Sequence, residues 1–122
     1  MYEITTEASF SAAHYLKDYN GPCENLHGHN WLVKATVRCE TLNSIGIGID
    51  FKELRGLLRE VLEELDHKDL NVVLAARSLN PSSENIACYV FGTMKQRLPA
   101  SACSMYRVEV FETPGNSTAY ME

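Results

Sequence analysis

The chain has 122 residues, of which 45% are hydrophobic and 22% charged, and its net charge is −5 at pH 7. This balance is typical of one soluble globular domain, residues 1–122, with a modest core. The acidic charge argues against a nucleic-acid partner, whose binding requires a basic face. No apolar run approaches the roughly 20 residues that cross a bilayer, and no export signal occurs, so we expect a cytoplasmic protein without a membrane partner.

The four cysteines are widely spaced, and none belongs to a Cys-x-x-Cys pair. In the cytoplasm such thiols stay reduced, because cellular reductants keep them so. The sequence therefore predicts four reduced thiols, at Cys23, Cys39, Cys88 and Cys103.

Two strand-like segments are separated by a polar loop. Residues 2–10 alternate between apolar and polar side chains, the pattern of a half-buried strand, and residues 30–39 alternate again. Residues 15–22 contain Asp, Asn, Gly and Pro, which predicts a loop that leads to Cys23. We expect the two strands to pair as a hairpin.

Two helices and two more strands follow. Asp50 with Glu53 predicts a capped helix start, and apolar residues then recur at helical spacing. The motif at residues 80–84 predicts the start of a second helix. Residues 106–112 alternate as a strand, and residues 117–121 form a shorter one. This order predicts the α+β class: a four-stranded antiparallel sheet with two helices packed on one face.

The segment from Cys23 to His29 carries the candidate chemistry. His27 and His29 project to the same face when the segment is extended, because strand side chains alternate. The predicted hairpin brings a third histidine, His14, close to them. Three imidazoles without an obvious fourth protein ligand describe an open zinc site, whose vacant position takes water or substrate. An exposed histidine pair beside a buried cysteine is the alternative.

Asp66 and His67 follow the first predicted helix. In one interpretation, Asp66 orients or charges His67 so that it acts as an acid or base. In the other, His67 only interacts with the dipole at the C-terminal end of the helix. The residues alone leave both interpretations open.

Six short motifs at compatible separations resemble those of one known family over nearly the whole chain. In order they are Phe10-x-Ala12-Ala13-His14, Cys23-x-x-x-His27-Gly28-His29, Asp50-Phe51, Asp66-His67-x-x-Leu70-Asn71, Asn80-Pro81-Ser82-Ser83-Glu84 and Glu112-Thr113. The family is that of the 6-pyruvoyl- and 6-carboxy-tetrahydropterin synthases. The resemblance implies a T-fold subunit. It also implies a homo-hexamer, a dimer of trimers, with active sites at subunit interfaces.

The resemblance further implies a metal and a substrate class. His14, His27 and His29 would bind Zn²⁺, whose remaining position takes oxygens of the substrate side chain. The substrate would be 7,8-dihydroneopterin triphosphate, a small-molecule pterin. Cys23 would accept a proton as its thiolate, a form that a nearby cation favours.

Other roles come from the same resemblance. Asp66 and His67 would form a relay that accepts or returns protons. Glu112 would receive adjacent N–H groups of the pterin ring with its two carboxylate oxygens. Ser82 and Ser83 are expected to hydrogen-bond the pterin, with simple helix capping as the alternative.

Glu24 makes the activity ambiguous within the family. The spacing Cys-x-x-x-His-Gly-His resembles the carboxy-forming branch, whereas Glu-x-x-His-Gly-His, which starts at Glu24, resembles a branch that releases 6-hydroxymethyl-7,8-dihydropterin for folate synthesis. The pyruvoyl-forming branch usually has a longer gap between the cysteine and the histidines. Glu24 is either an exposed loop residue or a second catalytic base.

We therefore expect a zinc-dependent lyase that makes 6-carboxy-5,6,7,8-tetrahydropterin for the synthesis of queuosine and other deazapurines. A folate-directed or dual activity is the first alternative. A non-catalytic zinc- or pterin-binding module is another, but it would not need Cys23, Asp66, His67 and Glu112 together. A thiol hydrolase built on Cys23 and His67 would leave the other three histidines unexplained.

Overall fold

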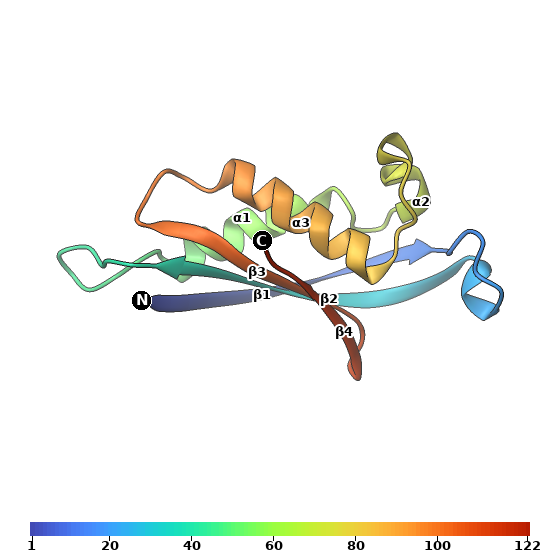
Figure 1. Ribbon diagram of the computed structural model, residues 1–122, viewed down its shortest axis with the longest axis horizontal. Helices are drawn as coiled ribbons and strands as arrows, with labels where there is room; N and C mark the ends of the chain where they lie inside the picture. The colour runs from blue at the N-terminus through green and yellow to red at the C-terminus, as the bar shows by residue number, and fades with distance from the viewer.

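The computed structural model describes residues 1–122 and contains a four-stranded antiparallel sheet in the order β1-β2-β3-β4. Its strands are β1 (Tyr2–His14), β2 (His27–Cys39), β3 (Cys103–Thr113) and β4 (Asn116–Tyr120). Two longer helices, α1 (Phe51–Glu63) and α3 (Ser83–Arg97), lie on the same face of the sheet (Figure 1). The predicted α+β architecture is confirmed.

The hydrophobic core lies between the sheet and these two helices. Strand β2 supplies alternate residues that are fully buried: Trp31, Val33, Ala35, Val37 and Cys39. Helix α1 starts after Asp50, whose side chain accepts a hydrogen bond from the Lys52 backbone N–H at 2.7 Å. Its inward face buries Leu54, Leu58, Val61 and Leu62. Each buried leucine contributes about 1.5–3 kcal/mol through removal of apolar surface from water. None of the helices has the length and apolar character that a membrane crossing requires.

The first two strands are longer than the alternation predicted. Strand β1 continues to His14, and β2 already begins at His27, where the two residues pair with each other. The small residues Ala12 and Ala13 interrupt the alternation in the sequence but still fit the sheet. The histidines therefore lie within the paired hairpin instead of in a loop beyond it.

Three short helical segments were not predicted: η1 (Pro22–Glu24), α2 (Leu70–Val73) and η2 (Ala75–Arg77). They are too short to show helical periodicity in the sequence. Just before α2, the chain runs along the edge of β1, where Ala13 forms a parallel bridge with Asp69. The Ala13 N–H donates to the Lys68 carbonyl at 3.1 Å. This segment covers the end of an otherwise open sheet edge.

The prediction of four reduced thiols is wrong for two of the cysteines. Cys39 and Cys103 form a disulfide, whereas Cys23 and Cys88 are free. The two bonded cysteines face each other in the pairing of β2 with β3. They are 64 residues apart in the sequence, so their spacing gives no sign of this pairing.

Candidate metal centre and adjoining pocket

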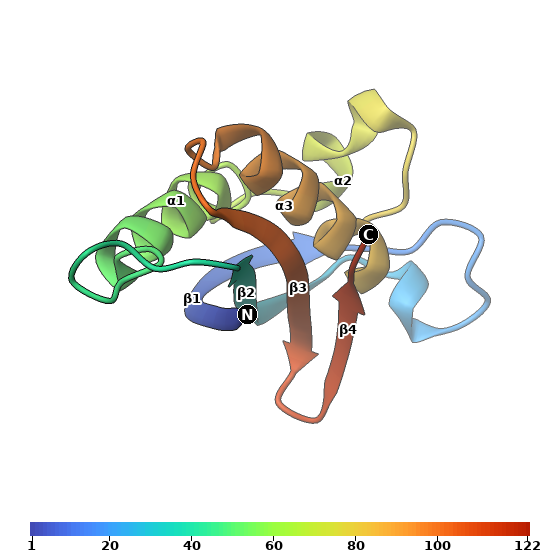
Figure 2. The same ribbon diagram turned by 60° about the vertical axis from the view of Figure 1, so that its left-hand side comes forward.

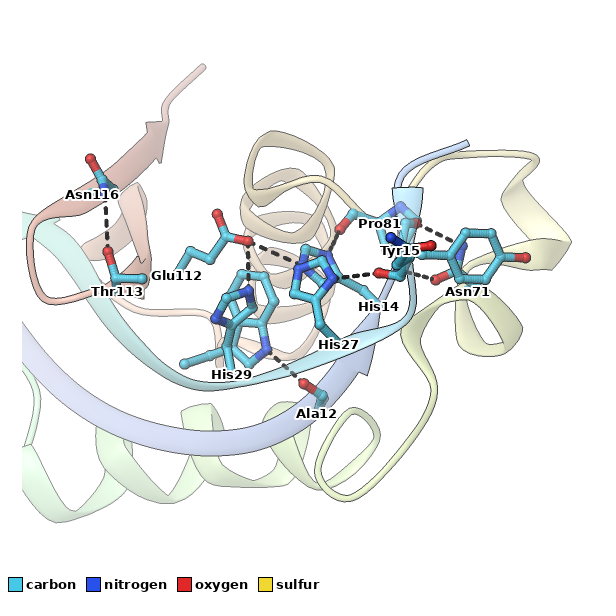
Figure 3. A network of polar contacts seen from close by, with 12 residues as sticks. Ala12, His14, Tyr15, His27, His29, Asn71, Pro81, Glu112, Thr113 and Asn116 are labelled. Atoms are coloured by element: carbon cyan, nitrogen blue, oxygen red, sulfur yellow. Dashed lines mark hydrogen bonds and ion pairs between the residues drawn. The ribbon is translucent and has the colours of Figure 1, made fainter. Parts of the chain in front are cut away.

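Three histidines converge at one end of the β1–β2 hairpin. His14 pairs with His27 and Ala12 pairs with His29, so the three imidazoles emerge on the helix-covered face. The ring centroids of His14 lie 4.6 Å from His27 and 5.3 Å from His29, and those of His27 and His29 are 4.8 Å apart. Figure 3 shows the rings gathered above the two strands. The expected convergence is present.

Glu112 joins the three histidines from β3. One carboxylate oxygen, Oε1, lies 3.1 Å from His14 Nε2 and 2.9 Å from His29 Nε2. The candidate ligand atoms of the four residues lie within 4.8 Å of one another. The resemblance implies that Glu112 binds the pterin ring, whereas its contact with the histidines was not predicted. Its position follows from the β3 alternation, which puts it on the same face as the buried Val108 and Val110. Figure 2 shows the β3–β4 hairpin that carries it.

Backbone carbonyls orient two of the imidazoles. His14 Nδ1 lies 2.8 Å from the Pro81 carbonyl, and His27 Nδ1 lies 2.6 Å from the Asn25 carbonyl. A carbonyl can only accept, so each Nδ1 carries a proton, and Nε2 is the nitrogen that can face a metal ion. His14 is 1% exposed, so its ring orientation is also fixed by packing.

The donors face one another in a way that a cation would stabilise. His14 Nε2 faces the Glu112 carboxylate at 3.1 Å, so a proton or a metal ion between the two groups would hold them together. His29 Nε2 is buried and makes no hydrogen bond, although Glu112 lies 2.9 Å away. Burial lowers the pKa of His29, and the Glu112 charge only partly offsets this. Neutral imidazoles with a carboxylate are ligands that a divalent cation such as Zn²⁺ accepts.

A cavity of about 200 Å³ adjoins this centre. Among the residues that line it are His14, Leu16, Cys23, Ser82, Ser83 and Glu112. Ser82 also accepts a hydrogen bond from the Asn85 backbone N–H at 3.2 Å, so it caps α3 as the alternative interpretation expected. The structure thus brings the thiol and both serines into one cavity with His14 and Glu112.

Glu24 lies outside this cavity lining. It is the last residue of η1 and is exposed, whereas its neighbour Cys23 is half-buried. Its carboxylate therefore stands at the rim of the loop that carries the thiol.

Asp66 and His67 form a pair, but they do not line the cavity that contains Cys23. Asp66 Oδ2 lies 2.9 Å from His67 Nδ1, and Oδ1 accepts the Ser11 backbone N–H at 2.9 Å. The Ser11 N–H, followed by His67, lowers the pKa of the Asp66 carboxyl. His67 has left-handed backbone geometry, with φ 56°, and its side chain is 82% exposed. His67, together with His29, lines an open hollow of about 510 Å³ beside β1, and Cys23 does not line it.

Comparison with known proteins agrees with this architecture. A family model described as 6-pyruvoyl tetrahydropterin synthase matches residues 3–122, and the chain belongs to this family. Its members are lyases that act on pterin substrates, and the sheet with its two covering helices is their T-fold.

Individual relatives carry two different names. The chain is 34% identical to 6-carboxy-5,6,7,8-tetrahydropterin synthase of Synechocystis, over 98% of this chain and 93% of that protein. The solved structure of 6-pyruvoyl tetrahydropterin synthase from Caenorhabditis elegans is 31% identical, with a TM-score of 0.84 over 100% of this chain and 97% of that one.

A Plasmodium vivax 6-pyruvoyltetrahydropterin synthase shares the fold at 20% identity, with a TM-score of 0.80 over 99% of this chain and 97% of that one. That structure is described as a catalytic-residue mutant in which a glutamate is changed to cysteine.

Proposed function

We propose that residues 1–122 act as one domain, a zinc-dependent lyase that converts 7,8-dihydroneopterin triphosphate to 6-carboxy-5,6,7,8-tetrahydropterin. The observation that carries this proposal is the cavity in which a free thiol, Cys23, adjoins His14, one of three histidines that converge on one point. The name of the Synechocystis relative supports the 6-carboxy product. In this role the enzyme would serve the synthesis of queuosine and related deazapurines in the cytoplasm.

The three histidines would hold Zn²⁺ through their unprotonated nitrogens. When bound, this ion supplies a positive charge that makes a substrate hydroxyl more acidic. The Pro81 and Asn25 carbonyls keep His14 and His27 in the tautomer that binding requires.

Cys23 would then accept a proton from the substrate side chain. Positive charge nearby favours the thiolate, which is the form that accepts protons. The half-burial of Cys23 limits competition from water while leaving the thiol open to the cavity.

Glu112 would anchor the pterin ring through its two carboxylate oxygens, which match two adjacent N–H donors. Its Oε1 lies 3.1 Å from His14 Nε2 and 2.9 Å from His29 Nε2. We propose that it turns from the histidines to the ring when substrate and metal bind. The hydroxyls of Ser82 and Ser83 stand in the same cavity and would hydrogen-bond the pterin.

The Asp66–His67 pair would act on a neighbouring chain. His67 lines a hollow that contains His29 but not Cys23, which favours an assembly that brings His67 of one subunit to Cys23 of another. A homo-hexamer, a dimer of trimers, would supply that arrangement. Refolding a mixture of Cys23→Ala and His67→Ala chains tests this, because shared sites would regain part of the activity. Mixing without any recovery would contradict it.

The main test is mass spectrometry of the products that the zinc-loaded protein makes from 7,8-dihydroneopterin triphosphate, beside Cys23→Ala and Glu24→Ala. We expect a 6-carboxy product that Cys23→Ala abolishes and Glu24→Ala retains. If the unaltered protein shows no turnover, the proposal that it is an enzyme is contradicted, and a zinc- or pterin-binding module is favoured.

A second candidate is the release of 6-hydroxymethyl-7,8-dihydropterin, alone or beside the 6-carboxy product. Glu24 directly follows Cys23 and lies on the same short turn, so small motions of η1 could exchange the two groups. A glutamate is named as a catalytic residue of the Plasmodium vivax protein, which has the same fold. A 6-hydroxymethyl product that Glu24→Ala abolishes would establish this activity.

A further inference from the structure

The chain leaves β1 after His14 in a three-residue segment, residues 15–17, that is held from both sides. On one side stands Asn71, in α2. Its Oδ1 accepts the Tyr15 backbone N–H at 2.9 Å, and its Nδ2 donates to the Tyr15 carbonyl at 3.0 Å. Figure 3 shows the Asn71 amide beside Tyr15. A single side chain thus satisfies both backbone groups of one residue.

Asn80 repeats this arrangement two residues further along. Its Oδ1 accepts the Lys17 backbone N–H and its Nδ2 donates to the Lys17 carbonyl, each at 3.1 Å. Asn80 comes from the loop before α3, so the two asparagines reach the segment from different elements. Each primary amide takes the place that a peptide group of a neighbouring strand would occupy.

The opposite side of the segment holds Cys23. The Leu16 backbone N–H donates to the Cys23 carbonyl at 2.8 Å. In an extended segment, backbone groups of successive residues point to opposite sides. The bonds of Tyr15 and Lys17 to the asparagines therefore direct the Leu16 N–H toward Cys23. The Leu16 side chain also lines the cavity that contains the thiol.

Few other backbone contacts hold the loop between β1 and β2, residues 15–26. Residues 17–20 are exposed, and the remaining backbone hydrogen bonds of the loop, such as Gly21 to the Tyr19 carbonyl and Glu24 to the Gly21 carbonyl, are internal to it. Burial of apolar side chains therefore contributes little to the position of the loop. The two amides are its main polar links to the helices.

We propose that Asn71 and Asn80 are positioning residues that fix Cys23 beside the histidine centre, acting through residues 15–17. They touch neither the histidines nor the cavity. The catalytic consequence rests on the proposed function, whereas the link from the asparagines to Cys23 does not.

The test uses the zinc-loaded protein with Asn71→Ala, Asn80→Ala and the double variant. Three properties are measured: hydrogen exchange of the Leu16 amide, the rate at which iodoacetamide alkylates Cys23, and kcat and KM for 7,8-dihydroneopterin triphosphate. In the double variant we expect Leu16 exchange to accelerate about tenfold or more and Cys23 alkylation to change severalfold. We expect kcat to fall about tenfold with little change in KM, and zinc content to stay the same.

The matched control is Asn43→Ala. Asn43 also organises a loop, since its Oδ1 accepts the Ile45 and Ile47 backbone N–H groups at 3.0 Å, but that loop lies at the other end of the sheet. We expect this control to change none of the three properties. Should the alanine variants fold poorly, Asn71→Asp and Asn80→Asp keep the accepting oxygen but place a negatively charged oxygen against the Tyr15 or Lys17 carbonyl, and we expect changes in the same direction.

Two outcomes separate this inference from the proposed function. Unchanged Leu16 exchange and Cys23 alkylation in the double variant would overturn the inference, whatever the turnover. Changes in both properties would support it even if the unaltered protein shows no turnover, in which case only the proposed function fails.

Discussion

The two ends of the β1–β2 hairpin are built from the same alternation of side chains but serve different purposes. At one end the inward positions hold His14, His27 and His29, whose nitrogens face a carboxylate. At the other end the inward position of β2 is Cys39, joined covalently to β3. The comparison teaches that the same alternation of side chains can produce either a closely packed end or a group of converging histidines. The difference depends on which residues take the inward positions.

The residues around the two ends of the hairpin also differ, with close packing at the disulfide end and polar contacts at the histidine end. At the disulfide end, Gly48 packs so closely that a Cβ there would lie 2.9 Å from the Cys39 Sγ. At the histidine end, polar contacts to Pro81 and Asn25 replace apolar packing. Close packing stabilises the fold, whereas directed polar contacts leave room for a ligand.

The largest expected effect is on turnover at the histidine end. Cys23→Ala should lower kcat about 10²–10⁴-fold, because it removes a proton-transfer group. Zinc content and the free energy of unfolding should stay near their original values, since Cys23 is only half-buried. Mass spectrometry of the product in reaction samples quenched at successive times measures this effect. Near-normal turnover in the variant would exclude Cys23 as the acceptor.

The next effect is on stability at the other end. Replacing Cys39 and Cys103 by serine should lower the free energy of unfolding by about 2–4 kcal/mol, because the unfolded chain is no longer cross-linked over a long loop. Urea denaturation measures this change, and reduction of the unaltered protein should reproduce it. If the two ends are independent, zinc binding will not change; a parallel loss of zinc would show that the ends are coupled.

Removal of the metal should have a comparable but concentration-dependent effect. A ligand that binds only the folded state at 100 times its Kd stabilises it by about 2.7 kcal/mol. Zinc should therefore raise Tm of the unaltered protein but not of His29→Ala, whose missing Nε2 is one of the converging atoms. Thermal unfolding with and without a chelator provides the measurement. Equal shifts in both proteins would place the ion elsewhere.

The smallest effect concerns a contact between the helices, away from both ends. The Arg97 guanidinium and then the Tyr89 hydroxyl lower the pKa of Glu64 below 4.5. A lowered pKa in the folded state stabilises the protein above the pKa of the unfolded state, and this contribution is lost as pH falls through the folded-state value. Glu64→Gln should thus cost at most about 1 kcal/mol at pH 7, since the pair is partly exposed.

The measurement is the difference in unfolding free energy between the two proteins, followed from pH 7 downward. This difference should shrink as pH falls below 4.5 and the Glu64 carboxylate of the unaltered protein takes up a proton. A difference that grows on acidification would contradict the assignment. Zinc binding at pH 7 should be the same in both proteins.

Local patterns in the sequence predicted the parts of the molecule that depend on neighbouring residues. Hairpin pairing of the first two strands was enough to bring His14 to His27 and His29, because only a short loop separates the strands. The pairing of β2 with β3 was not visible, since the strands are far apart in the chain and their register shifts between Thr36 and Val37.

The features that the sequence did not predict share that cause. The disulfide and the contact of Glu112 with the histidines both depend on the register of β2 with β3. The side-chain bonds of Asn71 and Asn80 depend on how α2 and the loop before α3 lie against residues 15–17. The periodicity of the sequence cannot predict such contacts, because each involves a single polar residue and a distant backbone group.

The start of α3 joins the metal centre to the hydrophobic core. The Pro81 carbonyl accepts from the His14 ring, and the next residue, Ser82, caps a helix whose Ile86 and Val90 are fully buried. A shift of α3 along its own axis would carry that carbonyl with it and tilt the imidazole. The affinity of the histidines for a metal ion would therefore depend on the packing of core residues that do not contact the ion. Substitutions chosen only for stability along α3 can retune the centre from a distance.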